Sequence, residues 1–285
     1  MGLLKDITIE EKGYAKINLA LHVIGKRADG YHVLDSIVVF TDVFDRLIIK
    51  YAVENKLTVT GEFSKFINVE KNSVLQALKL FENELTDRFS IILEKNLPIG
   101  AGLGGGSADA AALIRFIKNN YSNPMPSAEA ISKIGADIPA CVLSLASRVG
   151  GIGEIVRPIN ITGIDLWIVL VNPGIFVSTG SIFEELTEKY NDPLEPFIDL
   201  SSTDQLIEYL KCQRNDLQTV AVNKWPEINR VLNTIEETQD VLLFRMSGSG
   251  STCFGLYRTQ EIAKRAVSYI SKKSNKWWIK FSKIN

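Results

Sequence analysis

A glycine-rich stretch at 98–112, PIGAGLGGGSADAAA, constrains this 285-residue chain more than any other feature. Five glycines fall within positions 100–106, between a strand-like segment at 89–93 and an alanine-rich segment at 108–117. Because glycine has no Cβ, the backbone N–H groups of such a loop can face an anion, and the following helix adds its positive N-terminus. The pattern therefore predicts a strand, a phosphate-binding loop and a helix, in that order.

Two familiar phosphate-binding motifs do not explain this stretch. It lacks the Lys-Ser/Thr ending of a Walker A loop. Gly100, Gly102 and Gly105 satisfy the GxGxxG pattern, but no acidic residue for a ribose follows about 20 residues later. The remaining alternative is a turn that only allows close packing of the helix on the strand.

The composition is that of an ordinary globular protein, with 46 % hydrophobic and 23 % charged residues. Because 32 basic and 33 acidic residues nearly cancel, no global field attracts nucleic acid. Three cysteines (Cys141, Cys212, Cys253) and two histidines (His22, His32) predict neither a disulfide framework nor a multi-histidine metal site. The N-terminus shows no signal or transit peptide, which favours a bacterial cytoplasm.

The first half of the chain reads as a sheet followed by helices. Partial alternation at 13–24 and β-branched residues at 33–50 predict antiparallel strands, with a turn near Asp42–Asp45. Asn72 is suited to cap a helix through Glu84. Further helices are expected after Ser127 and after Asp137.

Turn residues suggest where the chain divides. Glycines cluster at 150–153 and Pro158 follows, which favours a boundary near residue 157. We therefore expect an N-terminal domain at 1–157 and a C-terminal domain at 158–285. A length of 285 residues is typical of two domains that share a cleft.

The second half is predicted to contain strands at 166–171, 240–244 and 252–257, and a helix that starts with a capping box of Ser181 and Glu184. The serine and glycine loop at 247–251 either closes a plain hairpin or approaches the first glycine loop across a cleft.

Lysines and tryptophans gather near the C-terminus. They resemble a basic aromatic patch of nucleic-acid binders, but WWIKF alternates like an edge strand, and lysines protect edge strands from aggregation. The residues concerned are Lys272, Lys273, Lys276, Trp277, Trp278, Lys280 and Lys283. We favour the edge strand and expect no nucleic-acid partner.

A few polar residues are candidates for chemistry. Lys16 and Asn18 lie two apart on a predicted strand and so share a face, where a buried lysine needs an acid or an anion. Lys16 could instead extend from the sheet rim to solvent. Asp137 could simply favour a helix start. Tyr31 and His32 could stack on and hydrogen-bond a base, or His32 could be an ordinary satisfied histidine.

Four segments, at 15–32, 98–112, 135–142 and 245–257, together resemble the GHMP kinase superfamily. Within it they are most similar to members that phosphorylate a CDP-linked sugar alcohol. The resemblance implies a two-domain α/β (α+β) fold, with an N-terminal domain like domain 2 of ribosomal protein S5 and a C-terminal ferredoxin-like αβ-plait. It also implies an active site in the cleft between the domains.

The resemblance further implies roles for individual residues. Lys16 and Asp137 match the catalytic pair. Cytosine would be held by Tyr31, His32 and Phe183, with Asn18 and Thr179 near the rest of the substrate. The ATP loop would consist of Pro98, Ile99, Gly100, Ala101, Gly102, Leu103, Gly104, Gly105, Gly106, Ser107 and Ala108.

ATP and Mg²⁺ are the expected cofactors, and the protein ligand of magnesium stays open, with Ser107 as one candidate. A monomer or a weak homodimer, without a membrane partner, is expected. Two alternatives stay open: another GHMP kinase that acts on mevalonate-like or homoserine-like alcohols, and a nucleotide-binding regulator without catalysis.

Overall fold

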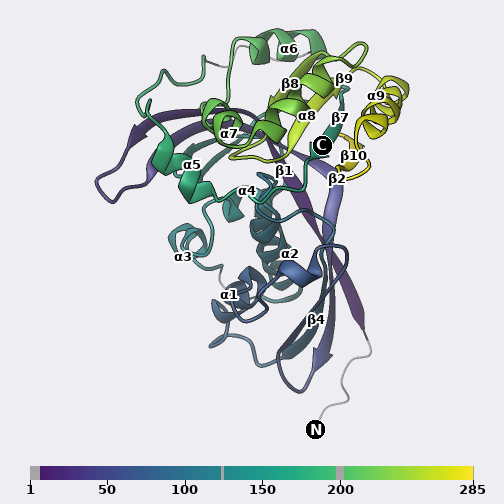
Figure 1. The fold of residues 1–285 in the computed structure, drawn as a ribbon. Helices are drawn as coiled ribbons and strands as arrows, with labels where there is room; N and C mark the ends of the chain where they lie inside the picture. Colours follow the sequence, from purple (N-terminus) through teal and green to yellow (C-terminus); the bar gives the residue numbers. More distant parts are fainter. Residues whose placement is uncertain (1–6, 123–124, 197–201, 285) are drawn as a thin grey trace.

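Two β-sheets form the framework of the molecule (Figure 1). The computed structural model describes residues 7–122, 125–196 and 202–284. The first sheet contains β1 (Thr8–Lys26), β2 (His32–Ala52), β3 (Lys56–Thr60), β4 (Arg88–Glu94), β5 (Ser147–Gly151) and β6 (Ile155–Pro158). Its order is β3-β4-β2-β5-β6, and β1 pairs with β2. Both β1 and β2 run from the lower end of Figure 1 to the upper part of the molecule.

The predicted turn near Asp42–Asp45 is wrong, because β2 passes through these residues as one strand. Tyr14 lies opposite Phe44, whereas Lys16 lies opposite Phe40. The three intervening residues of β2 thus face a single residue of β1, which makes an irregular bulge in the ladder. The residues that resemble a turn in the sequence, Asp42–Asp45, lie at and beside this bulge.

Helices cover the first sheet, and the sequence predictions for these helices are confirmed in part. They are α1 (Ser73–Lys79), α2 (Gly105–Asn120), α3 (Ala128–Ser132) and α4 (Ile138–Leu143), with a short 3₁₀ turn, η1 (Ser64–Phe66). The helix predicted at 108–117 is confirmed within α2, and the Asn72 cap is confirmed, since its Oδ1 accepts from Val74 N–H at 2.8 Å. However, α1 ends at Lys79 instead of Glu84, because Leu80 and Phe81 continue in tighter i→i−3 turns.

The second sheet contains β7 (Trp167–Asn172), β8 (Leu243–Met246), β9 (Cys253–Tyr257) and β10 (Trp278–Lys283), in the order β10-β7-β9-β8. Its helices are α5 (Thr179–Glu185), α6 (Thr203–Lys211), α7 (Gln218–Lys224), α8 (Pro226–Glu236) and α9 (Gln260–Lys273). Helices lie between β7 and β8 and between β9 and β10, which is the βαββαβ arrangement of a ferredoxin-like plait. The predicted edge strand is confirmed, because β10 stands at the end of the strand order β10-β7-β9-β8.

Two local predictions in this half are wrong. Ser178 precedes the first residue of α5, so Ser181 lies inside the helix, where its hydroxyl donates to Ser178 O instead of forming a capping box with Glu184. β8 begins at Leu243 instead of Asp240, because Asp240 has a left-handed backbone with φ 61°. Within the described ranges, no helix is both long and apolar enough to cross a bilayer.

The two halves share a hydrophobic core. Leu19 of β1 and Val39 of β2 are buried in one cluster with Leu170 of β7, Leu210 of α6 and Leu256 of β9. Removing such apolar side chains from water is the main favourable contribution to folding. The long β1–β2 hairpin therefore belongs to the core of both halves.

We propose that the domain boundary lies near residue 157. The last strand of the first sheet, β6, ends at Pro158, and the first strand of the second sheet, β7, begins at Trp167. The boundary separates the two sheets, whereas the core described above continues across it.

A buried arginine connects the halves. The guanidinium of Arg245 donates to the carbonyls of Leu19 at 2.6 Å, Leu210 at 3.0 Å and Gln213 at 2.7 Å. Burial lowers the pKa of Arg245 to about 10. We expect Arg245→Met to lower the free energy of unfolding by about 2–4 kcal/mol, because it leaves buried carbonyls without donors. Urea unfolding followed by tryptophan fluorescence measures this loss.

The matched control for this prediction is Arg258→Met. Arg258 makes an exposed ion pair with Asp204, a type of contact worth about 0–1 kcal/mol. Equal losses of stability in the two variants would contradict the role given to Arg245.

Candidate active site

The glycine loop joins β4 to α2 in a conformation that requires glycine. Gly100, Gly102 and Gly104 have φ values of 59°, 71° and 64°. L-residues with a side chain rarely adopt this left-handed region. Gly104 is the residue before the first turn of α2, so the loop places its backbone at the helix N-terminus. Such a terminus favours an anion.

Three other segments hold the carbonyl oxygens of this loop. The backbone N–H of Lys16 donates to Leu103 O at 3.0 Å, that of Thr252 to Ala101 O at 3.1 Å and that of Val177 to Gly100 O at 3.0 Å. The loop is thus fixed through its carbonyls. Its N–H groups are the donors that an anion would need.

The second glycine loop lies directly against the first. The Ser247 hydroxyl donates to Gly102 O at 2.8 Å, and a Cβ on Gly102 would stand 2.1 Å from Ser247 O. The loop also connects β8 to β9, whose pairing is antiparallel. Both sequence interpretations of 247–251 therefore hold, since a hairpin connection approaches the first glycine loop.

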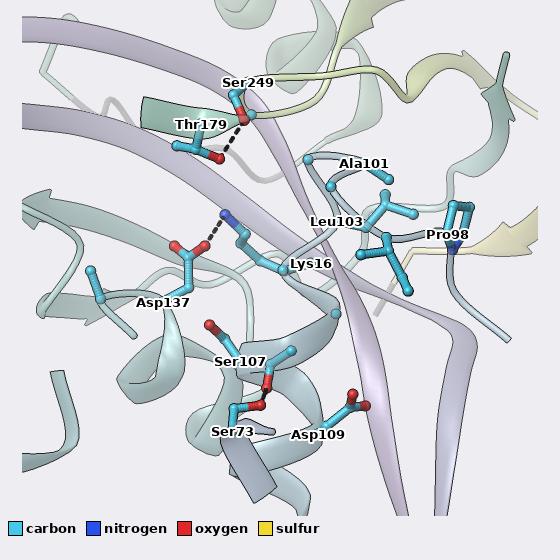
Figure 2. A pocket seen from close by; sticks show the side chains of 18 of the residues that line it. Lys16, Ser73, Pro98, Ala101, Leu103, Ser107, Asp109, Asp137, Thr179 and Ser249 are labelled. Carbon is cyan, nitrogen blue, oxygen red and sulfur yellow. Dashed lines mark hydrogen bonds and ion pairs between the residues drawn. The ribbon is translucent and has the colours of Figure 1, made fainter. Parts of the chain in front are cut away.

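Lys16 and Asp137 form an ion pair beside the end of the glycine loop (Figure 2). Their Nζ and Oδ2 atoms are 3.0 Å apart, and the side chains are 6 % and 38 % exposed. The prediction of a buried lysine paired with an acid is confirmed, and extension to solvent is excluded. Asp137 occupies the N-cap position of α4, but its side chain caps no backbone N–H.

Asn18 connects this pair to the second glycine loop. Its Oδ1 accepts from Lys16 Nζ at 2.9 Å, and its Nδ2 donates to the Ser36 hydroxyl at 2.8 Å. The backbone N–H of Asn18 donates to Ser247 Oγ at 3.1 Å. The predicted common face of Lys16 and Asn18 on β1 is confirmed.

These groups surround a cavity of about 640 Å³. Lys16, Asn18 and Asp137 line it, together with the glycine loop from Pro98 to Ser107. Thr179 and Phe183 border it from the second half of the chain, and the Thr179 and Ser249 hydroxyls lie 2.9 Å apart. Figure 2 places this hydroxyl pair on one side of Lys16 and Asp137, and Ser107 with Ser73 on the other.

One wall of the cavity had no sequence prediction. It consists of Phe66, Ile67, Asn68, Lys71, Asn72 and Ser73, and the Ser73 hydroxyl donates to Gly106 O at 2.6 Å. For Asn72 the sequence predicts only a helix-capping role. The segment before α1 has no motif of its own, so only the fold brings it against the loop.

Three predicted residues do not line this cavity. The side chain of Ala108 is buried in the core beneath α2. Tyr31 is 60 % exposed at the β1–β2 turn. His32 stacks on Phe183 at 4.9 Å between ring centroids, with an interplanar angle of 20°. Because Phe183 also lines the cavity, the stack lies beside it.

His32 carries an unsatisfied polar atom. Its Nε2 is buried and has no hydrogen-bond partner among the described residues. Burial lowers the pKa of His32 below the ordinary 6.5, and the charges of Lys26 and Lys189 lower it further. The ring is therefore mostly neutral at pH 7.

The described residues contain no group of three or more His, Cys, Asp or Glu side chains that could hold a metal ion.

Family profiles match both halves of the chain. GHMP kinases N terminal domain matches residues 72–150, and GHMP kinases C terminal matches residues 194–276. The chain belongs to the GHMP kinase family. It is an ATP-dependent small-molecule kinase, and the fold expected from the resemblance is confirmed.

Two relatives of this GHMP kinase carry the same name. The 4-diphosphocytidyl-2-C-methyl-D-erythritol kinase of Cereibacter sphaeroides is 40 % identical over 267 residues, which cover 93 % of this chain and 95 % of the relative. The enzyme of the same name from Parvibaculum lavamentivorans is 39 % identical over an alignment of 287 positions. The alignment covers 96 % of this chain and 97 % of the relative.

Solved structures show the same fold. A crystal structure of 4-(cytidine 5'-diphospho)-2C-methyl-D-erythritol kinase matches with a TM-score of 0.79 at 26 % identity, covering 97 % of this chain and 99 % of that one. Homoserine kinase from Cytophaga hutchinsonii matches with a TM-score of 0.66 at 15 % identity, covering 99 % and 96 %. At this lower identity the likeness concerns the fold alone.

Proposed function

We propose that this GHMP kinase transfers the γ-phosphoryl group of ATP to the 2-hydroxyl of 4-diphosphocytidyl-2-C-methyl-D-erythritol. The products are the 2-phosphate and ADP, within the non-mevalonate isoprenoid pathway. Relatives of this name align over nearly the whole chain. The observation that carries the mechanism is the Lys16–Asp137 pair, 3.0 Å apart beside the N-terminus of α2.

The glycine loop holds the phosphates of ATP in this proposal. The N–H groups of the loop and the positive end of α2 both favour negative charge. The nucleoside then lies along the wall at 66–73, where Phe66 is 63 % exposed and Ile67 also lines the cavity. An apolar surface beside a polar loop is typical of a nucleotide pocket.

Asp137 is the proposed general base. Its Oδ2 is paired with Lys16, so the other carboxylate oxygen can accept the proton of the attacking hydroxyl. The hydroxyl oxygen forms a bond to the γ-phosphorus as the bond from that phosphorus to the ADP oxygen breaks. Lys16 orients Asp137 and offsets negative charge on the transferring group.

Magnesium fits this site as an ion shared with the phosphates. The Ser107 hydroxyl lines the cavity, and a hard oxygen ligand of this kind suits Mg²⁺. When bound, the ion would offset the negative charge of the phosphates. The small number of acidic side chains agrees with the usual magnesium site, which relies on substrate phosphates.

The cytidine end of the alcohol is proposed to lie at the His32–Phe183 stack. The unpaired Nε2 of His32 offers a hydrogen bond to the base, and the exposed ring of Tyr31 offers a stacking surface. Asn18 and Thr179 line the same cavity as Phe183 and the catalytic pair, and are proposed to contact the rest of the substrate.

The neutral state of His32 predicts a pH dependence of substrate binding. Because its pKa is lowered below the ordinary 6.5, the ring is mostly neutral at neutral and alkaline pH. We expect KM for the CDP-alcohol to be constant at neutral and alkaline pH and to rise as the acid form accumulates. Initial rates at saturating ATP measure it. His32→Gln, which does not titrate, should remove the acid-side rise, and an unchanged rise in that variant would contradict the assignment.

A substrate panel tests the proposed function. With ATP and magnesium, ADP release should require the CDP-alcohol, and CMP but not mevalonate should compete with it. Preference for mevalonate or homoserine would instead assign another GHMP kinase activity. ATP binding without any alcohol-dependent ADP release would indicate a regulator.

A further inference from the structure

A buried cation and two buried carboxylates lie beneath the glycine loop. Lys95, next to the end of β4, pairs with Asp45 of β2 and with Asp109 of α2, the latter at 2.7 Å from Nζ to Oδ2. The three side chains are 3 %, 0 % and 2 % exposed. Lys95 and Asp109 nevertheless line the cavity described above. This buried cluster is not used by the mechanism.

The cluster holds the chain on both sides of the loop. Asp45 Oδ1 accepts from the N–H groups of Asn96 at 2.6 Å and Leu97 at 2.8 Å, the two residues before Pro98. Asp109 lies in the second turn of α2, after the loop, and Figure 2 shows it beyond Ser107 along the helix. Lys95 therefore connects the start of the loop to the helix that follows it.

The loop is also shaped around the lysine. A Cβ on Gly105 would stand 3.1 Å from Lys95 Nζ, closer than ordinary van der Waals contact. The ammonium thus lies directly under the first residue of α2, where phosphate is expected. A shift of Lys95 would move the backbone that faces the phosphates.

The two carboxylates are not equivalent. Asp45 accepts three hydrogen bonds, whereas Asp109 Oδ1 is buried without a partner among the described residues. Burial, together with the charge of Asp45, raises the pKa of Asp109 well above its ordinary value, against the effect of Lys95. A neutral side chain of the same shape should therefore be tolerated at position 109.

We propose that Lys95 is a positioning residue for ATP, which sets the separation between the start of the glycine loop and α2 through its pairs with Asp45 and Asp109. This rests on the proposed function, in which the loop binds the phosphates. Lys95 acts through the loop backbone, so its loss should weaken ATP binding and leave the CDP-alcohol site unchanged. A purely structural role would lower stability without that selectivity.

The test uses the triple variant Lys95→Met/Asp45→Asn/Asp109→Asn, which replaces the cluster without leaving a buried charge. Both KM for ATP and Kd for a non-hydrolysable ATP analogue should rise at least about tenfold, because small displacements of a positioned group are costly. KM for the CDP-alcohol should stay within about twofold. Unchanged ATP constants, or equal rises for both substrates, would overturn the proposal.

Arg148→Met is the matched control. Arg148 makes a bidentate, half-buried pair with Asp35, at 2.8 and 2.5 Å, away from the glycine loop. Its loss should lower thermal stability while the ATP constants stay the same. An equal rise of the ATP constants in this variant would show that the effect is general and overturn the proposal.

A second pair of variants keeps the test decisive if the triple variant does not fold. Asp109→Asn keeps an oxygen acceptor for Lys95, whereas Asp109→Ala removes it. We expect ATP constants within about threefold of wild type for the first and a rise of about tenfold for the second. Equal ATP constants in the two variants would overturn the proposal. Failure of the proposed function is distinguishable, because the wild-type protein would then release no ADP with the CDP-alcohol.

Discussion

Replacing Asp137 with asparagine is expected to lower kcat by about 10³-fold, with KM for ATP and for the CDP-alcohol within about threefold of wild type. Asparagine keeps the shape and an oxygen for Lys16 but cannot accept the hydroxyl proton. Since the Asp137 side chain caps no backbone N–H, the start of α4 should be preserved. Lys16→Met should cause a loss of similar size, because Asp137 then lacks its 3.0 Å partner. Steady-state ADP release measures both variants.

The double variant Lys16→Met/Asp137→Asn provides an internal check. Residues that act as a unit have non-additive effects, so the double variant should be little worse than either single variant. Asp204→Asn is the matched control, because it makes the same chemical change in an exposed ion pair with Arg258. Near-normal turnover of Asp137→Asn, with circular dichroism unchanged, would contradict the assignment of a general base.

Replacing Gly102 with alanine is expected to have the second largest effect. The new Cβ would stand 2.1 Å from Ser247 O, in a backbone with φ 71°, so the two glycine loops would have to separate. Stability should fall by more than the about 1–2 kcal/mol that a left-handed backbone costs alone. Turnover should fall by about 10²-fold, because the phosphate-binding backbone moves. Urea unfolding and ADP release measure the two effects.

Gly174→Ala distinguishes the cost of a left-handed backbone from the cost of a steric clash between the two glycine loops. Gly174 also has a left-handed backbone, with φ 80°, but nothing lies within 4 Å of a Cβ placed there. It should therefore lose only the backbone cost and keep its turnover. If Gly102→Ala and Gly174→Ala lose the same stability and the same activity, contact between the glycine loops is not what the site depends on.

Local chemistry made part of the site predictable. Glycine spacing within 98–112 indicated a phosphate loop between a strand and a helix, and β4 and α2 confirm both neighbours. The two-residue spacing of Lys16 and Asn18 predicted a common face, since strand side chains alternate. The pairing of Lys16 with Asp137 follows only from the resemblance, because Asp137 lies 121 positions further along the chain and no local pattern connects the two residues.

Long-range contacts explain the wrong predictions. Asp42–Asp45 resembles a turn in sequence, but Asp45 is satisfied by Lys95 and two backbone N–H groups, so β2 continues through it. No local pattern predicts these contacts of Asp45 and Lys95 beside the glycine loop either. The wall at 66–73 has no predictive pattern for the same reason, since its contact with the loop depends on the packing of α1 on α2.

The most direct test of the proposed reaction is the stoichiometry and position of phosphoryl transfer. The purified protein is incubated with ATP, magnesium and 4-diphosphocytidyl-2-C-methyl-D-erythritol, and ADP and product are followed by chromatography and phosphorus NMR. We predict one ADP for each alcohol consumed and a new phosphomonoester on the 2-hydroxyl. ADP formation that does not depend on the alcohol, or a phosphoryl group on another hydroxyl, would contradict the proposal.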